Sequence, residues 1–413
     1  MKKKKNTEIG FNKRGQSLVV VGYHKQFSLI QLFFGLMNGA LMFNAAFLKS
    51  CGLNATQVGG FISIASLIGM FAPMVWGMVS DKYKTVKRIV YICLCCMLVV
   101  YLPIPFYSKL VVGSLSLAPV FIIAQAAFSG APEAMITAWI MQTQRQHPEI
   151  QYGFIRMFFT GAFALSNFMY MFIIEKTSYN AIFIGYATFA LLIMLLLTRY
   201  PDAKPSDTGR PKSFKDMHVE RIFKNRFLII YVIFMVFACI PTSSLGLFTP
   251  YLIESIGGNA SLLGGMIALR SVCAVPMLYF SNRFVRKLGP RNTLLIGSSL
   301  LCISQVVFAF CRTMPQAFAN CALMGVGLGI MMPSEVSFVN EQAPDGLIAT
   351  CQTVCGTVYS IAGILCSFLG GIVVDSLGIR NYYQIVVCLT AAAILFFFIS
   401  TLILMKKQKA HQA

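Results

Sequence analysis

Four charged residues lie inside long apolar stretches of the chain: Glu133, Arg156, Arg270 and Glu335. A charge at the centre of a bilayer costs roughly 2.5–3.5 kcal/mol or more, so each of the four needs a compensating role. A buried carboxylate can bind and release a proton, and a guanidinium presents two parallel donors that fit a carboxylate or neighbouring hydroxyls. These residue types therefore predict proton transfer and recognition of a polar solute inside a membrane.

We expect Glu133 or Glu335 to carry the proton. Arg156 would then orient the solute, with Arg270 as a countercharge or second ligand. Amide groups expected to add hydrogen bonds to the same cavity belong to Asn38, Asn44 and Gln352. The alternative interpretation is that each embedded polar group is paired only to hold helices together. No histidine falls in an expected span, which argues against a histidine proton relay. Three acids at expected outer helix ends are predicted to be solvated caps: Glu175, Glu254 and Asp375.

The composition places these residues in a membrane protein. Of 413 residues, 57% are hydrophobic and only 12% are charged, with a mean hydropathy of +0.71. Soluble domains average about 25% charged residues, so a soluble enzyme, a secreted disulfide scaffold and a disordered regulator are excluded. The 13 cysteines mostly lie in apolar runs and are predicted to be small buried hydrophobes, with no metal site.

A transmembrane helix needs about 20 predominantly apolar residues. The sequence predicts twelve, at 27–48, 57–79, 88–107, 113–141, 153–174, 179–198, 227–252, 262–281, 293–311, 315–339, 347–374 and 381–405. The polar stretch 200–226 separates two sets of six. The predicted fold is an all-α integral membrane protein with two pseudo-symmetric six-helix bundles (1–199 and 227–413) around a central cavity, joined by a cytoplasmic linker (200–226).

The distribution of basic residues predicts the orientation. Expected loops and tails on the side of the N-terminus hold 27 of the 34 Lys and Arg residues, against five on the opposite side. Cytoplasmic loops carry such an excess, so both termini are expected in the cytoplasm. The net charge of +20 is then a signal of topology, and we expect the lipid bilayer, and no nucleic acid, as a partner.

An internal repeat relates the two halves. Residues 50–60 read SCGLNATQVGG and residues 255–265 read SIGGNASLLGG, with six of eleven positions identical. Both segments follow the first span of their half and lie on the same side of the membrane, so the halves are predicted to be parallel repeats. Two similar bundles around a cavity are the architecture that alternating access requires.

The loop after the second expected span contains a glycine, an aspartate and then a basic cluster. This loop resembles the signature loop of the major facilitator superfamily. Together with the span count and the two halves, it makes the chain similar to that family over its whole length. The resemblance implies that the loop latches the outward-facing state, through Gly77, Asp81, Lys82, Lys87 and Arg88. The alternative is that the basic residues only anchor the cytoplasmic side.

The segment Tyr152-Gly-Phe-Ile-Arg156 is similar to the start of the fifth span in the oligosaccharide:proton symporters, the lactose permease group, and in related nucleoside and aromatic-acid permeases. In those proteins the arginine of Gly-x-x-Arg binds substrate, and Arg156 matches it. An aromatic ring seven residues on stacks on the sugar, and Phe163 has that position. The group's acidic partner in span 4 lies further along than Glu133, and its span-10 histidine and glutamate are absent.

We expect a secondary active transporter for a small polar organic solute, a sugar, oligosaccharide or nucleoside, working as a proton symporter without a cofactor. The alternative within transport is a proton-driven exporter of drugs or metabolites. A sensor or an enzyme fits less well, because the sequence has no appended soluble domain and no nucleophile or metal motif in its spans. By the family resemblance, the expected location is the cytoplasmic membrane of a bacterium, and we expect a monomer.

Overall fold

The computed structural model describes residues 18–83, 85–108, 111–112, 115–147, 150, 152–198, 225–343 and 348–412. Within these residues, 12 helical segments are long and apolar enough to cross a membrane. The prediction of an all-α membrane protein with twelve spans is therefore confirmed. The expected linker 200–226 lies almost wholly outside the described residues.

The first half holds most of its residues in long helices. Its elements are α1 (Leu18–Gly39), a 3₁₀ turn (Ala40–Phe43), α2 (Asn44–Ser50), α3 (Ala55–Tyr83), α4 (Val86–Tyr101), α5 (Ile104–Tyr107), β1 (Val111–Val112), β2 (Leu115–Ser116), α6 (Ala118–Gln146), α7 (Tyr152–Lys176) and α8 (Asn180–Thr198). The two strands pair antiparallel, with Val111 opposite Ser116. Because this hairpin precedes α6, the fourth span begins later than the expected residue 113.

The second half repeats the pattern without a hairpin. Its elements are α10 (Arg226–Ala238), α11 (Ile240–Ser255), a 3₁₀ turn (Ala260–Leu262), α12 (Leu263–Leu288), α13 (Pro290–Phe310), α14 (Met314–Gln342), α15 (Ile348–Leu377) and α16 (Ile379–Gln412). Local chemistry sets several boundaries: the Asn225 side chain accepts from Phe227 N at the start of α10, and Gly289, at φ +80°, ends α12. Pro290 then begins α13, as proline favours the first helical turn.

The first span of each half is interrupted. The first is divided by the 3₁₀ turn Ala40–Phe43, and the seventh breaks at Cys239, immediately before Ile240-Pro241. A proline at the start of α11 lacks the N–H that would continue the hydrogen bonds of α10. Interrupted membrane helices expose backbone and polar side chains only where they line a cavity or are covered by protein.

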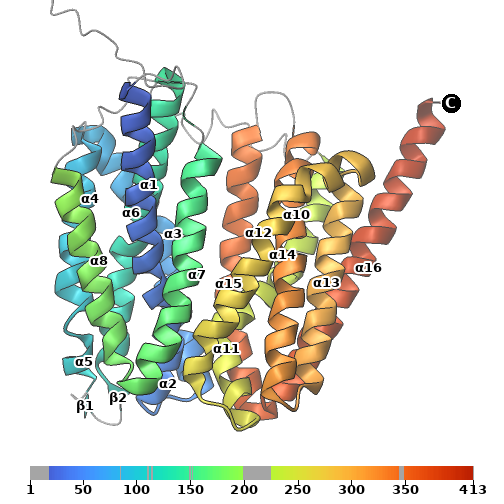
Figure 1. Ribbon diagram of the computed structural model, residues 1–413. Coiled ribbons are helices and arrows are strands. Elements are labelled where there is room, and N and C mark those ends of the chain that lie inside the picture. Colours follow the sequence, from blue (N-terminus) through green and yellow to red (C-terminus); the bar gives the residue numbers. More distant parts are fainter. Residues whose placement is uncertain are drawn as a thin grey trace, which may run out of the picture.

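The helices form two bundles that stand side by side (Figure 1). In the first, α1 packs on α7 and α8, and α6 packs on α3 and α4; in the second, α14 packs on α12 and α13, and α16 on α10 and α13. The main contacts between the bundles are α3 with α15 and α7 with α12. We call the side where α1 begins and α16 ends the termini side, and the opposite side, at the bottom of Figure 1, the far side.

Candidate solute-binding cavity

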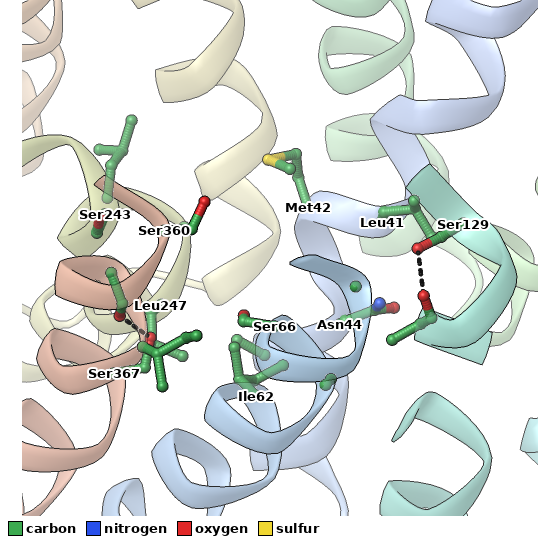
Figure 2. A pocket seen from close by; sticks show the side chains of 18 of the residues that line it. Leu41, Met42, Asn44, Ile62, Ser66, Ser129, Ser243, Leu247, Ser360 and Ser367 are labelled. Atoms are coloured by element: carbon green, nitrogen blue, oxygen red, sulfur yellow. Dashed lines mark hydrogen bonds between the residues drawn. The ribbon is translucent and has the colours of Figure 1, made fainter. Parts of the chain in front are cut away.

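A cavity of about 600 Å³ lies between the two bundles. The first half contributes Leu41, Met42, Asn44 and Ala45 around the break in its first span, together with residues of α3 and α6. The second half contributes residues 242–243 and 245–247, which follow the break in its own first span, together with residues of α12 and α15. Figure 2 shows Met42, Asn44 and Ser66 on one wall, facing Ser243 and Ser360 on the other. The interrupted helices of the two halves therefore meet at one central space.

Two of the predicted binding residues line this cavity, Asn44 and Arg270. The Asn44 Oδ1 accepts a hydrogen bond of 2.6 Å from the buried Tyr101 hydroxyl, which fixes the orientation of the amide. Arg270, on α12, has a buried Nε without a hydrogen-bond partner. It is also the one charged side chain among the lining residues that the structure describes.

Arg156 and Glu133 form an ion pair. The Arg156 Nη1 donates to Glu133 Oε1 at 2.7 Å, and the Arg156 guanidinium lies 4.1 Å from the centre of the Phe159 ring. Both charged side chains are about one-third exposed, at 34% and 32%. On α6, Glu133 follows the lining residue Ser129 by four positions, so it continues the cavity-facing stripe towards the termini side. The sequence alone left open whether these two charges would meet.

Glu335 lies in the second bundle, on α14, away from the cavity lining. Its Oε1 is buried and has no hydrogen-bond partner. The carboxylate interacts electrostatically with Tyr231 on α10 and with Cys355 and Tyr359 on α15. Tyr359 also lines the cavity and interacts electrostatically with Arg270. Tyr359 is thus subject to the charges of both the buried carboxylate and the cavity arginine, a relationship that the sequence analysis missed.

Three other candidates are placed elsewhere. The Asn38 amide donates to Phe34 O of its own helix at 2.9 Å. Phe163 stacks on Phe159, with ring centres 6.2 Å apart. Gln352 donates to Val336 O at 3.1 Å and to Asn340 Oδ1 at 2.9 Å, which ties α15 to α14. These contacts agree with the packing alternative for Asn38 and Gln352, although their roles in transport remain predictions.

The loop predicted as a latch lies on the termini side. Gly77, on α3, has open space where a Cβ would point, and the side chain of Asp81 is outside the described part of the chain. The Lys87 Nζ donates to Thr198 O at 3.4 Å, a bond within the first bundle. Two more of its basic side chains are exposed: Lys82 and Arg88. The latch role stays a prediction.

Polar contacts join the two bundles on the far side. Asp375, at the end of α15, accepts hydrogen bonds from Ala55 N at 2.9 Å and Thr56 N at 2.6 Å. Lys49, at the end of α2, forms an ion pair with Glu254 at the end of α11. Glu254 and Asp375 are exposed, as expected of solvated caps, but each also bonds to the opposite half, which the sequence analysis did not anticipate. For Glu254 the signal was its position directly before the repeated segment 255–265.

The negative charge of Glu254 also affects the pKa of a nearby tyrosine, Tyr179. Tyr179, in the far-side loop between α7 and α8, is half-buried. Burial, with the negative charge of Glu254, raises the pKa of Tyr179 to about 12. Glu254 belongs to the other bundle, so its charge acts on Tyr179 across the contact between the bundles.

Glycines of the repeated segments allow the two bundles to pack closely on the far side. A Cβ on Gly59 would collide with Ser367 O of α15, and a Cβ on Gly264 would collide with Asn167 O of α7. The two glycines occupy equivalent positions in the repeat. The segment that revealed the internal repeat is therefore also the segment that lets the bundles approach.

The exclusion of histidine from the spans was wrong for one residue. His24 lies in α1, within the first membrane-spanning segment Gly22–Ser50, and its ring is 6.0 Å from that of Phe154. The first span was expected to begin at residue 27, three positions after His24. No group of three His, Cys, Asp or Glu residues suited to a metal ion occurs in the described residues.

Comparisons with known proteins show which family model and which relatives the sequence matches. The sequence model of the MFS_1 like family matches residues 27–385. The uncharacterized transporter YwbF of Bacillus subtilis (strain 168) is 22% identical over 370 residues, 88% of this chain and 89% of YwbF. The multidrug transporter protein MdtP of the same bacterium is 24% identical over 156 residues, 37% of this chain and 28% of MdtP.

Solved structures share the fold. A mutant of the nucleoside transporter NupG has a TM-score of 0.79 and 14% identity, and the match covers 91% of this chain and 99% of that chain. The D-xylose-proton symporter has a TM-score of 0.69 and 15% identity, with 92% of this chain and 97% of that chain covered. At these identities the likeness establishes the architecture alone.

Proposed function

This chain belongs to the MFS_1 like family, so it is a membrane transporter and not an enzyme, and we propose that it imports a small polar solute of the sugar or nucleoside kind together with protons. The observation that carries the proposal is the cavity between the bundles, with Arg270 unpaired in its wall. Its volume of about 600 Å³ falls within the range of small-molecule pockets, about 300–1,000 Å³.

The conformation supports alternating access. The polar and glycine contacts between the bundles lie on the far side, while the Arg156–Glu133 pair lies towards the termini side of the cavity. With the termini side in the cytoplasm, as the basic residues predict, closure of the far side would correspond to an inward-facing state. Release of the far-side contacts and closure of the termini side would expose the same cavity outside.

For proton coupling we favour Glu335 over Glu133. Glu133 is already compensated by Arg156 at 2.7 Å, whereas Glu335 has a buried oxygen without a partner. Protonation removes the cost of holding an unpaired negative charge away from water. Tyr359 interacts with both Glu335 and Arg270, so solute bound at Arg270 and a proton on Glu335 would influence each other.

Proton-driven export is the second candidate. The partial similarity to MdtP, whose name describes a multidrug transporter, is the observation that favours it. Import and export use the same cavity and differ in the direction of the proton relative to the solute. Export requires solute to move out as protons move in.

The test is the pH of a weakly buffered medium around cells that produce the protein, measured on addition of a panel of sugars, nucleosides and organic acids. Alkalinisation with one class, absent in cells without the protein, would establish proton symport and the solute class together. Labelled solute entering without a pH change would remove proton coupling. Proton-dependent loss of preloaded solute would establish export instead.

A further inference from the structure

Arg270 is an uncompensated charge in the cavity wall. Its Nε is buried without a hydrogen-bond partner, and among described residues it forms no ion pair of the kind that joins Arg156 to Glu133. An unpaired charge within the membrane carries a large free-energy cost. A packing role does not account for this cost, because a packing arginine would be satisfied by its neighbours.

Two side chains with hydroxyl groups, Tyr359 and Thr242, line the cavity together with Arg270. Tyr359 lines the cavity and interacts electrostatically with the guanidinium, and its hydroxyl lies 2.8 Å from that of Thr242. Thr242 also donates to Cys239 O at 2.7 Å, so Tyr359 is the donor between the two hydroxyls. Because a hydroxyl hydrogen rotates readily, the Tyr359 O–H can turn to a new acceptor. Arg270 and Tyr359 therefore bring a guanidinium and a hydroxyl donor to the wall of one cavity.

The rest of the described lining is neutral. It includes the amides of Asn44 and Gln125 and the hydroxyls of Ser66 and Ser360, with apolar side chains between them. The cavity wall therefore carries one positive charge and several groups able to hydrogen-bond a hydroxylated body. One carboxylate neutralises this charge, whereas a doubly charged phosphate would leave a negative charge uncompensated in a low-dielectric site.

We infer that the solute is a hydroxylated monocarboxylate, of the sugar-acid type, whose carboxylate is bound by Arg270 and Tyr359 between the two bundles. The inference rests on the proposed function in one respect: the cavity is taken as the solute site. Arg270 supplies charge-assisted hydrogen bonds to the carboxylate, and the amides and hydroxyls of the wall bind the body. The geometry of a guanidinium favours a planar carboxylate over a neutral hydroxyl group.

The test is ligand-induced stabilisation of the purified protein in detergent, followed by thermal unfolding. The probes are gluconate, glucuronate and lactate as sodium salts, each paired with its primary amide, which keeps the shape and removes the charge. We expect at least one carboxylate to raise the unfolding temperature while its amide does not, since ligand binding stabilises the folded state. Arg270→Gln should weaken the binding of that carboxylate roughly 10- to 100-fold.

Arg312→Gln is the matched control, because it removes the same charge from an exposed position beyond α13. It should keep the carboxylate response. Arg270→Lys keeps the positive charge but lacks the two parallel donors of a guanidinium. This variant should bind the carboxylate more weakly than the unmodified protein does, while still preferring the carboxylate to its amide. The unfolding temperature without ligand reports in the same scan whether each variant is folded.

Amides that stabilise as well as the acids would overturn the inference, as would a carboxylate response that survives in Arg270→Gln or no response to any of the acids. The proposed function fails separately. Neutral sugars or nucleosides that enter with protons would support symport and refute the carboxylate. Carboxylates that bind at Arg270 without proton movement would leave the ligand class intact and refute the coupling.

Discussion

Asp375 accepts a hydrogen bond from Ala55 N at 2.9 Å and thereby joins the end of α15 to the start of α3 in the other bundle. The first N–H groups of a helix have no partners within the helix, and a carboxylate there is favoured by both the hydrogen bond and the helix dipole. The contact therefore stabilises a far side that is closed, and its loss should favour opening.

Replacing Asp375 by Ala should destabilise this contact by about 1 kcal/mol, the usual cost of losing a helix cap. Hydrogen–deuterium exchange of the first turn of α3 should become faster by roughly five-fold. Glu175→Ala is the control, because Glu175 is an exposed acid near the corresponding end of α7. Unchanged exchange in Asp375→Ala would show that the contact does not hold the far side closed.

Gly59→Ala should hinder closure of the far side, because the new Cβ would collide with the backbone oxygen of Ser367. Overpacking of this kind costs about 1–3 kcal/mol, which would shift the protein towards states open on the far side and slow solute exchange. Gly60→Ala is the adjacent control, since its Cβ would meet the Phe368 ring at 3.9 Å, an ordinary contact. Equal exchange rates in the two variants would contradict the role of Gly59.

Glu133→Gln should destabilise the protein by about 1–2 kcal/mol, because it leaves Arg156 without its charged partner in a site only one-third exposed. The double variant with Arg156→Gln should be less destabilised than the sum of the two single variants. Thermal unfolding of all four proteins measures this coupling. Additive effects would mean that the ion pair contributes nothing to stability.

Glu335→Gln should abolish uphill accumulation of solute and spare exchange of solute across the membrane, since a permanently neutral side chain cannot release a proton. Radiolabelled uptake with and without a proton gradient separates the two activities. Glu341→Gln, an exposed position on the same helix, should retain both. Accumulation that persists in Glu335→Gln would refute its coupling role.

The twelve spans and the repeat could be predicted from the sequence, because hydrophobic length and local identity are properties of the chain itself. The four embedded charges were also visible, since each stands alone in an apolar run. Their partners were not. Glu133 meets Arg156 only because α6 and α7 pack in one bundle, while Arg270 is brought to the cavity and left unpaired by the packing of α12.

Contacts between the bundles were the least predictable. Asp375 and Ala55 are 320 positions apart, and neither residue type signals its partner. Gly59 was visible as part of a repeat, but its need for a missing Cβ follows only from the approach of α15. The amino-acid sequence by itself determined which segments enter the membrane, through the free energy of burying apolar side chains. The tertiary structure decided which polar groups are satisfied, because that depends on the relative placement of helices far apart in the chain.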